Sequence, residues 1–258
     1  MESFATMTRE NVLRILRTLV ALALLPVALH GVAAQVSPYR ILAGDIPPFT
    51  TEKGADAPGA LGEMVKELGA RIGVSAPIEF LPWSRAQAFA QKDARVLILP
   101  LTRTPEREAH YRWLVKLYQQ QFVFIARRDS AVNVAAVDEL RKLRIVVLRD
   151  SPNVPQLRSR KFMQIIEANS VDDMTHMLKL SMVDAIYGGE EVNLHVLDQN
   201  GVARPDLNVS APLEIGEVWL GGSLDFTQDE ANAWQKAMTQ LKADGSYKRI
   251  LQAYHLPE

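Results

Sequence analysis

The sequence predicts an α/β fold of two lobes, in which two mixed, mostly parallel sheets are flanked by helices and joined by a hinge with two chain crossings. Three observations lead to this expectation. From residue 39 onward, short apolar runs alternate with segments of helical periodicity. The alternation stops at the polar segment 127–130 and then starts afresh. A strand-like run at 214–220 has the character of a strand that returns to the first unit, so the second unit interrupts the first.

The first lobe is expected to comprise residues 35–126 and 214–258. An apolar stripe at helical spacing, followed by Gly73, predicts a helix over 61–72, because glycine is favoured just past a helix end. Ser84 and Thr227 are candidate N-caps, the first for a helix to about residue 91 and the second for a long amphipathic helix to residue 243. Strands are predicted at 39–43, 78–81, 95–101, 121–126 and 214–220, and a last helix follows Asp244 and Gly245.

The second lobe is expected to comprise residues 127–213. Ser170, with Asp172 and Asp173 in the first turn, marks the start of a helix that runs to residue 180. The other predicted elements are helices at 137–143, 154–161 and 190–199, strands at 144–148, 164–167 and 184–187, and a turn at 203–206. Two lobes of this kind leave a cleft between them, and clefts between domains are frequent ligand sites.

The N-terminal segment predicts export. Arg9, Arg14 and Arg17 precede an uncharged stretch at 18–29, and a small-residue pattern ends at Ala34. We interpret residues 1–34 as a signal peptide, because the uncharged core is too short to span a bilayer comfortably. The chain contains no cysteine, so a lipid anchor on a cysteine at the cleavage site is excluded. The expected location is the periplasm, after cleavage near Gln35.

Composition narrows the class of function. The formal net charge is −1, from 29 Lys and Arg against 30 Asp and Glu, which lacks the basic excess of a nucleic-acid binder. The histidines are scattered, with no two at metal-ligand spacing on one helix. The sequence has no P-loop, dinucleotide-binding glycine pattern or G-x-S-x-G motif. We therefore expect no cofactor, no metal and no nucleic-acid partner.

The segment RVLILPLTRTPERE, residues 95–108, carries the strongest functional signal. Its apolar half has the length and composition of a buried strand, and Thr104 followed by Pro105 predicts a helix start. Arg107 then falls in the first helical turn, next to the hydroxyls of Thr102 and Thr104. Because ligands of open α/β sheets bind beyond the carboxyl ends of strands, this is a candidate carboxylate site. The alternative is that Arg107 pairs with a neighbouring glutamate or another surface carboxylate.

Several motifs in this order resemble those of the type II periplasmic solute-binding proteins of ABC importers, in particular the polar amino-acid-binding group, which is the bacterial extracellular solute-binding protein family 3. The resemblance covers residues 39–256. The segments that carry it are DIPPF at 45–49, LGEMVKELGARIG at 61–73, TRTPER at 102–107, VDAIYGGEE at 183–191 and ADGSYKRILQAYHL at 243–256. It implies the two-lobed fold and a ligand held between the lobes.

The resemblance also implies roles for residues of the first lobe. Arg107 would grip a ligand carboxylate with two parallel hydrogen bonds, with help from the Thr102 hydroxyl. Trp83 would cover the ligand as an aromatic lid, and Phe49 is the second candidate for that role or a core residue near the hinge. Asp45 would reach the ligand amino group or only fix its own loop.

In the second lobe, the family presents small residues at the start of a helix, where this chain has Arg149, Asp150 and Ser151. Ser151 and the amides after it keep the anion-binding character of a helix start. Arg149 and Asp150 depart from the family pattern and would place charge in the cleft, or would form a surface ion pair at a turn.

A second departure concerns the ligand amino group, which the family commonly binds through an aspartate shortly after the VDA motif. This chain has Gly189 at that place. Glu190 or Glu191 would substitute, or both would be solvent-exposed charges in a first helical turn. Arg85 would add a second positive contact beside the aromatic lid, or would face solvent. The ligand is therefore expected to be a small carboxylate-bearing solute, with an amino acid as the first candidate and other carboxylates or peptide fragments left open.

The function implied is capture of this solute by a monomeric binding protein for an ABC permease in the inner membrane. Two alternatives share the fold. One is a periplasmic enzyme similar to cyclohexadienyl dehydratases, which would need a general acid such as Glu190 or Glu191 in the cleft. The other is a sensor protein that presents its ligand to a signalling receptor.

Overall fold

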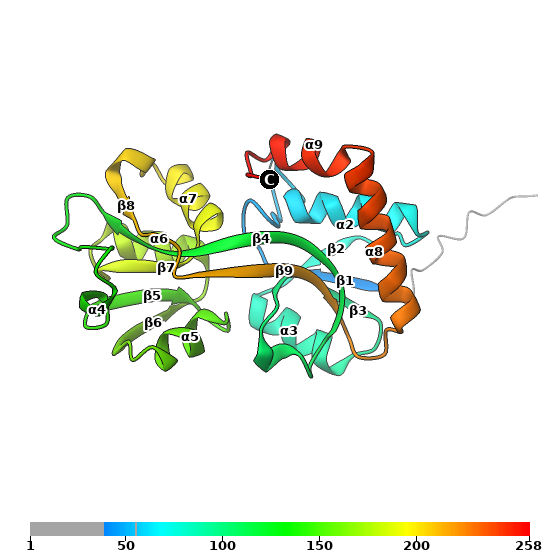
Figure 1. Ribbon diagram of the computed structural model, residues 1–258, viewed down its shortest axis with the longest axis horizontal. Helices are drawn as coiled ribbons and strands as arrows, with labels where there is room; N and C mark the ends of the chain where they lie inside the picture. Colours follow the sequence, from blue (N-terminus) through cyan, green and yellow to red (C-terminus); the bar gives the residue numbers. More distant parts are fainter. Residues whose placement is uncertain (1–38, 55) are drawn as a thin grey trace, which may run out of the picture. The chain divides into compact units, whose positions relative to one another are not determined.

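The computed structural model describes residues 39–54 and 56–258 of the chain. The predicted signal peptide at 1–34 lies outside the described residues. Within the described part, no helix combines the length and the apolar character needed to cross a bilayer. The α/β fold class is confirmed, since strands and helices alternate along this part of the chain (Figure 1).

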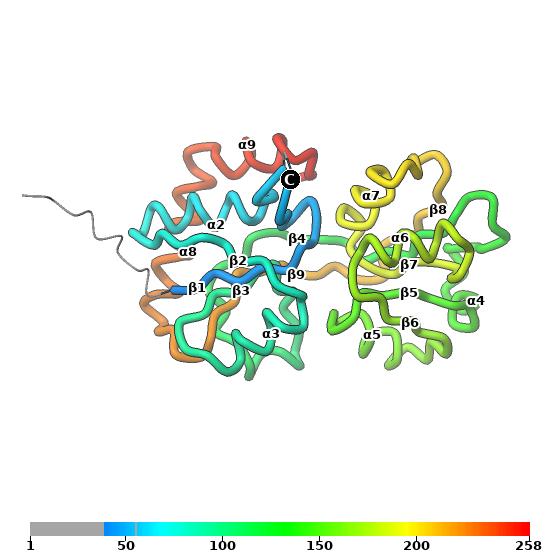
Figure 2. The backbone as a smooth tube through the Cα atoms, turned by 180° about the vertical axis from the view of Figure 1, so that it is seen from behind, coloured from blue at the N-terminus to red at the C-terminus, as the bar shows by residue number. Residues whose placement is uncertain are grey.

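The first lobe is built on three parallel strands covered by helices on both faces. β1 pairs with β2 and with β3, in register Ile41↔Ile78 and Ile41↔Leu97. In Figures 1 and 2, α2, α8 and α9 cover one face of these strands and α3 covers the other. The elements are β1 Arg40–Ala43, α2 Ala60–Arg71, β2 Ile78–Phe80, α3 Trp83–Lys92, β3 Val96–Thr102, α8 Gln228–Ala243 and α9 Ser246–Ala253.

The second lobe repeats this plan with other strands. β5 pairs in parallel with β6 and with β7, in register Ile145↔Ile165 and Ile145↔Ala185. α6 and α7 lie on one face of these strands, and α4 and α5 lie on the other (Figure 1). The elements are α4 Val137–Leu140, β5 Arg144–Leu148, α5 Asn153–Ser159, β6 Gln164–Ala168, α6 Val171–Lys179, β7 Ala185–Gly189, α7 Glu190–Gln199, the 3-10 turn η2 Arg204–Asp206 and β8 Leu207–Val209.

Two long strands run through both lobes. β4, Arg112–Arg127, pairs antiparallel with β9, Glu214–Gly222, along almost the whole length of β9. β9 also pairs with β3 in the first lobe, and β4 also pairs with β7 in the second lobe. The hydrogen-bonded order is β2-β1-β3-β9-β4-β7-β5-β6, with β8 on β4, so the sheet halves of the two lobes are continuous through β4 and β9.

Apolar cores lie on both faces of the strands, and the largest of them also includes Val171, Val192 and Val196 of the second lobe. The larger core of the first lobe lies between the strands and helices α2, α8 and α9, and Trp234 of α8 is 2% exposed there. A second cluster lies under α3. The second lobe has two clusters, one of which contains the stacked rings of Phe124 and Phe162. The lobe boundaries between residues 126 and 127 and between 213 and 214 stay a prediction; they fall near the second-lobe ends of β4 and β9.

Local start and stop signals account for many of the observed bounds. Ser170 accepts a hydrogen bond from the Asp173 backbone N–H, as an N-cap does. Thr227 and Glu230 form a complete capping box at the start of α8. Gly73 follows α2 with φ +74°, and the Val74 N–H donates to the Gly69 carbonyl, which closes the helix end in a left-handed cap.

Three expectations about local structure differ from what is observed. Ser84 is not an N-cap, because the Arg85 and Ala86 N–H groups donate to the Pro82 carbonyl and α3 already begins at Trp83. Thr104 and Pro105 begin only the three-residue 3-10 turn η1, Pro105–Arg107, because the chain then turns into β4 at Arg112. The strand expected at 121–126 is the second half of a sixteen-residue strand.

Candidate functional site

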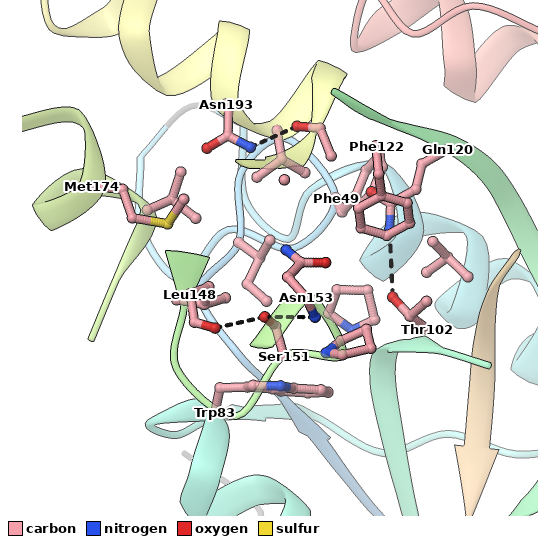
Figure 3. A pocket seen from close by; sticks show the side chains of 18 of the residues that line it. Phe49, Trp83, Thr102, Gln120, Phe122, Leu148, Ser151, Asn153, Met174 and Asn193 are labelled. Atoms are coloured by element: carbon pink, nitrogen blue, oxygen red, sulfur yellow. Dashed lines mark hydrogen bonds between the residues drawn. The ribbon is translucent and has the colours of Figure 1, made fainter. Parts of the chain in front are cut away.

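A pocket lies between the two lobes and is walled mostly by apolar side chains. It encloses about 580 Å³, its open mouth included. The apolar lining residues are Ile46, Phe49, Trp83, Pro100, Phe122, Leu148, Pro152, Val171, Met174, Val192 and Val218. The polar ones are Thr102, Arg107, Gln120, Ser151, Asn153 and Asn193, and the backbone at Gly188 and Gly189 completes the wall. Both lobes therefore contribute to one cavity (Figure 3).

Arg107 is the charged residue of this wall, and its guanidinium is bonded to neutral oxygens. Nη1 donates to the Thr102 carbonyl at 3.1 Å. Nη2 donates to Gln87 Oε1 and to the Asp150 carbonyl, each at 2.9 Å. Desolvation lowers the pKa of Arg107, with a smaller opposing effect from Asp150 among its neighbours, but a guanidinium stays protonated in proteins. Arg107 is thus a largely buried cation held by uncharged acceptors.

The alternative in which Arg107 pairs with a neighbouring glutamate does not match the side-chain contacts. Glu108 instead forms an ion pair with Arg103, with Nε and Oε1 2.7 Å apart. Among the residues that the structure describes, no carboxylate lies within 4.0 Å of the Arg107 guanidinium. The positive charge of Arg107 has no counter-charge in direct contact.

Asp150 connects the two lobes through its backbone. Its carbonyl accepts hydrogen bonds from Arg107 and from Gln87 Nε2, the latter at 3.2 Å, and both donors belong to the first lobe. Asp150 has φ +56°, a left-handed conformation that aspartate adopts more readily than most residues. The departure from the family pattern at this position therefore involves a main-chain contact with the carboxylate-site candidate.

Trp83 and Phe49 are both aromatic residues of the wall. The Trp83 ring lies at one end of the pocket, opposite Asn193 (Figure 3). It packs over Gly44, where a Cβ would lie 3.1 Å from Trp83 Cε3. Phe49 is only 1% exposed and makes an edge contact with Tyr118, with centroids 5.2 Å apart. Phe49 is thus a core residue whose ring also reaches the pocket. Trp83 is only half-buried, as expected of a side chain that covers a ligand.

Ser151 and Thr102 also line the pocket. The Ser151 hydroxyl donates to the Leu148 carbonyl at 2.6 Å, which fixes the turn between β5 and α5. The Thr102 hydroxyl accepts a hydrogen bond from Gln120 Nε2 at 3.4 Å. Arg107, Thr102 and Ser151 thus lie in the wall of one cavity, as does Trp83.

Four other candidates lie outside this lining. The Asp45 carboxylate accepts from the Glu52 N–H at 3.0 Å and fixes its own loop. Arg85 is exposed and lies over the Phe89 ring. Arg149 bonds Asn169 Oδ1 at 2.8 Å. Glu190, at the start of α7, forms an ion pair with Arg204 of η2, with Oε1 and Nη2 3.8 Å apart. Glu191 is also absent from the lining; it lies near Tyr118, and burial raises the pKa of its carboxyl.

The sequence did not single out three buried amides of the wall or Gln87. Gln120, Asn153 and Asn193 are 6%, 4% and 2% exposed. Neutral amides have no characteristic spacing, so no motif points to them. The available signal was the Gly188-Gly189 pair at a strand end, because glycines in a strand often mark a place where another part of the chain or a ligand approaches the backbone closely. Across the described residues, no group of three His, Cys, Asp or Glu could hold a metal ion.

The architecture and the pocket define the class: this is a periplasmic-binding-protein-like fold with a cavity between its lobes. The chain belongs to the bacterial extracellular solute-binding proteins, family 3, whose model matches residues 41–257. Comparison with curated protein sequences gives no match.

Solved structures share the fold at low sequence identity. An arginine 3rd transport system periplasmic binding protein from Legionella pneumophila is 19% identical with a TM-score of 0.73, over 84% of this chain and 99% of that one. A mutant of the arginine-binding protein ArgBP from T. maritima is 17% identical with a TM-score of 0.74, over 84% and 95%. A histidine kinase sensor domain is 14% identical with a TM-score of 0.76, over 84% and 96%.

Proposed function

We propose that this protein captures a small carboxylate-bearing solute between its lobes and delivers it to an ABC permease. The observation that carries the proposal is the state of Arg107: a desolvated guanidinium in the pocket wall, bonded to neutral oxygens and without a contacting counter-charge. A buried cation is favourable when an anion pairs with it, and the Nε–H and the second Nη1–H of Arg107, which make no hydrogen bond within the described residues, can donate charge-assisted hydrogen bonds to a carboxylate. The ligand supplies that anion.

Contacts from both lobes support a binding mechanism that includes closure. Arg107 and Thr102 come from the first lobe, and Ser151 and Asn153 come from the second. β4 and β9 carry the chain between the lobes and are the natural axis of a hinge motion. A ligand carboxylate on Arg107 brings in second-lobe groups, and the bonds from Gln87 and Arg107 to the Asp150 carbonyl stabilise the closed form. Trp83 covers the apolar part of the ligand.

The proposal includes export to the periplasm by the signal peptide at 1–34 and action as a monomer. Family membership supports an extracytoplasmic binding role. It also includes the lobe division 35–126 plus 214–258 and 127–213, whose boundaries lie near the second-lobe ends of β4 and β9.

A sensory role is the second candidate, supported by the likeness to a histidine kinase sensor domain. It uses the same pocket and differs only in the partner of the closed form. Copurification of the loaded protein with a permease favours import, and copurification with a receptor kinase favours sensing. A dehydratase activity has less support, because Glu190 and Glu191 do not line the pocket and Arg107 is its one ionisable group among the described residues.

The test is thermal unfolding of the purified protein against amino acids, hydroxy and keto acids, small carboxylates and prephenate. A ligand that binds the folded state raises the midpoint by mass action. We expect a shift with a carboxylate, lost in Arg107→Ala and kept in the matched control Arg85→Ala, since Arg85 is exposed on the same lobe outside the lining. An equal shift in Arg107→Ala, or turnover of prephenate, would contradict the proposal.

A further inference from the structure

The pocket contains one charge, which limits the charge of its ligand. Arg107 is the one ionisable residue among the described residues of the lining. An α-amino acid carries an ammonium group beside its carboxylate. Burying that ammonium in the same cavity as the Arg107 guanidinium is disfavoured, because neutral oxygens replace its hydration only in part and no carboxylate of the lining offsets the two positive charges. The wall matches a ligand with a single negative charge.

The Gln120 side chain occupies the space next to residue 189. A Cβ at Gly189 would lie 2.2 Å from Gln120 Oε1 and 3.2 Å from Gln120 Cδ, so even an alanine does not fit while Gln120 stays in place. The backbone of Gln120 belongs to β4, which pairs with β7 in register Phe122↔Gly189, and its side-chain Nε2 donates to the Thr102 hydroxyl at 3.4 Å. A neutral amide therefore occupies the space that a carboxylate on residue 189 would need.

Two other amides offer acceptors to the ligand. Asn153 Nδ2 donates to the Tyr187 carbonyl at 3.4 Å, and Asn193 Nδ2 donates to the Gly189 carbonyl at 2.7 Å. These bonds orient the amides, and within the described part of the chain both Oδ1 atoms are buried without a donor. Figure 3 shows the Asn153 side chain between Trp83 and Asn193. A buried acceptor without a donor is costly, and a hydroxyl or carboxamide N–H of a ligand relieves that cost.

We propose that the ligand is a small monocarboxylate with an apolar body, without an ammonium group, and with a neutral hydrogen-bond donor such as a hydroxyl. This inference rests on the proposed role of Arg107 as the carboxylate grip. The carboxylate pairs with Arg107, the apolar body lies against Trp83, Phe122 and Met174, and the donor reaches the Asn153 or Asn193 oxygen.

The first experiment compares ligands that differ in one group. Calorimetric titration of the full-length mature protein uses two trios: phenylalanine, 3-phenyllactate and 3-phenylpropionate, and leucine, 2-hydroxy-4-methylpentanoate and 4-methylpentanoate. We expect the hydroxy acid to bind at least tenfold tighter than the amino acid, and tighter than the unsubstituted acid. Equal or tighter binding of the amino acid overturns the inference. Equal binding of the hydroxy acid and the unsubstituted acid overturns the part of the inference that gives the ligand a hydrogen-bond donor.

The outcome separates this inference from the proposed function. Tight, Arg107-dependent binding of an amino acid would support the proposed function, in which Arg107 binds a carboxylate. It would contradict only the inference that the ligand has no ammonium group. If the library yields another acid, the same three forms are made from it. If no carboxylate in either trio or in the library binds, both proposals fail.

The second experiment introduces a carboxylate at position 189, where the family commonly has an aspartate. Gln120→Ala combined with Gly189→Asp places a carboxylate in the freed space, and Gln120→Ala alone is the control. We expect the double variant to change the ratio of amino-acid to hydroxy-acid affinity at least tenfold toward the amino acid. An unchanged ratio in a double variant with a cooperative unfolding transition overturns the inference; if that variant does not fold, the ligand trios decide.

Discussion

Two arginines at opposite ends of β3 have opposite environments. Arg95, just before the strand, donates to Glu230 Oε2 at 3.2 Å and lies near Asp225. Its guanidinium also lies over the rings of Tyr39 and Phe226, 4.5 and 4.3 Å from their centroids. The hydrogen bond to Glu230 raises the pKa of Arg95, whereas desolvation lowers that of Arg107 after the strand.

The difference shows how a structural arginine and a ligand-binding arginine are told apart. Arg95 finds its counter-charges within the fold, so its interactions are complete without a ligand. Arg107 is fixed by the Thr102 and Asp150 carbonyls and by Gln87, which orient the guanidinium and leave its charge unbalanced. Charge that the fold orients without neutralising is the physical mark of a site prepared for an anion.

The largest expected effect is that replacing Arg95 changes stability but not ligand affinity, whereas replacing Arg107 changes ligand affinity more than stability. Arg95→Ala is expected to reduce the free energy of unfolding by about 2–3 kcal/mol, because it removes the ring contacts and the ion pair with Glu230, and to leave ligand affinity unchanged. Arg107→Ala is expected to change stability by no more than about 1 kcal/mol and to weaken carboxylate binding roughly 100-fold, the usual effect of removing a buried charged partner. Urea unfolding and calorimetric titration of both variants measure this; equal losses of stability would remove the distinction.

A smaller effect is expected at the partner of Arg95. Hydrogen bonds from Arg95 first, and from the Thr227 N–H and hydroxyl, lower the pKa of Glu230 to about 2. Glu230→Gln is expected to cost about 1–2 kcal/mol at neutral pH, because it weakens the capping box and the ion pair together. Asp229→Asn, which changes another acidic residue of the same first turn, is the matched control.

The pH dependence of this effect follows from the depressed pKa. The carboxylate is favoured in the folded state, so its contribution is complete above the unfolded pKa near 4.5 and is lost as the pH falls from there toward 2. The stability difference between the unmodified protein and Glu230→Gln should therefore shrink over this window. A difference that is constant down to pH 2, measured by urea unfolding, would show that the charge of Glu230 does not contribute.

Much of the fold could be predicted because local signals agree with the tertiary structure. β5 and α7 have the predicted bounds, and Ser170 caps α6 as expected. The first half of β4 and all of β8 were missed. Gln119, Gln120 and Gln121 interrupt the apolar pattern of β4, since this strand crosses between lobes and part of it faces the pocket. Strand pairing with β9, which is not local, overrides the polar composition there.

The site was predictable in proportion to how much of it follows from a motif. Arg107, Thr102 and Ser151 lie at strand ends next to recognisable turns, so the sequence pointed to them. Gln120, Asn153 and Asn193 acquire their importance from burial, and burial at a particular wall cannot be read from residue type. The contacts of all these residues with a ligand stay predictions.

The smallest expected effect is the response of ligand affinity to pH, which tests whether Arg107 is the only charged group of the pocket that acts on the ligand. Arg107 does not titrate near neutrality, and no other described residue of the lining is ionisable. A carboxylate ligand is fully ionised above about pH 5.5, so its affinity should change less than about twofold between about pH 5.5 and 8.5. Calorimetric titration across this range measures it. A larger change across this range, with a single inflection, would instead indicate that a titrating acid such as Glu191, whose pKa burial raises, takes part in the site.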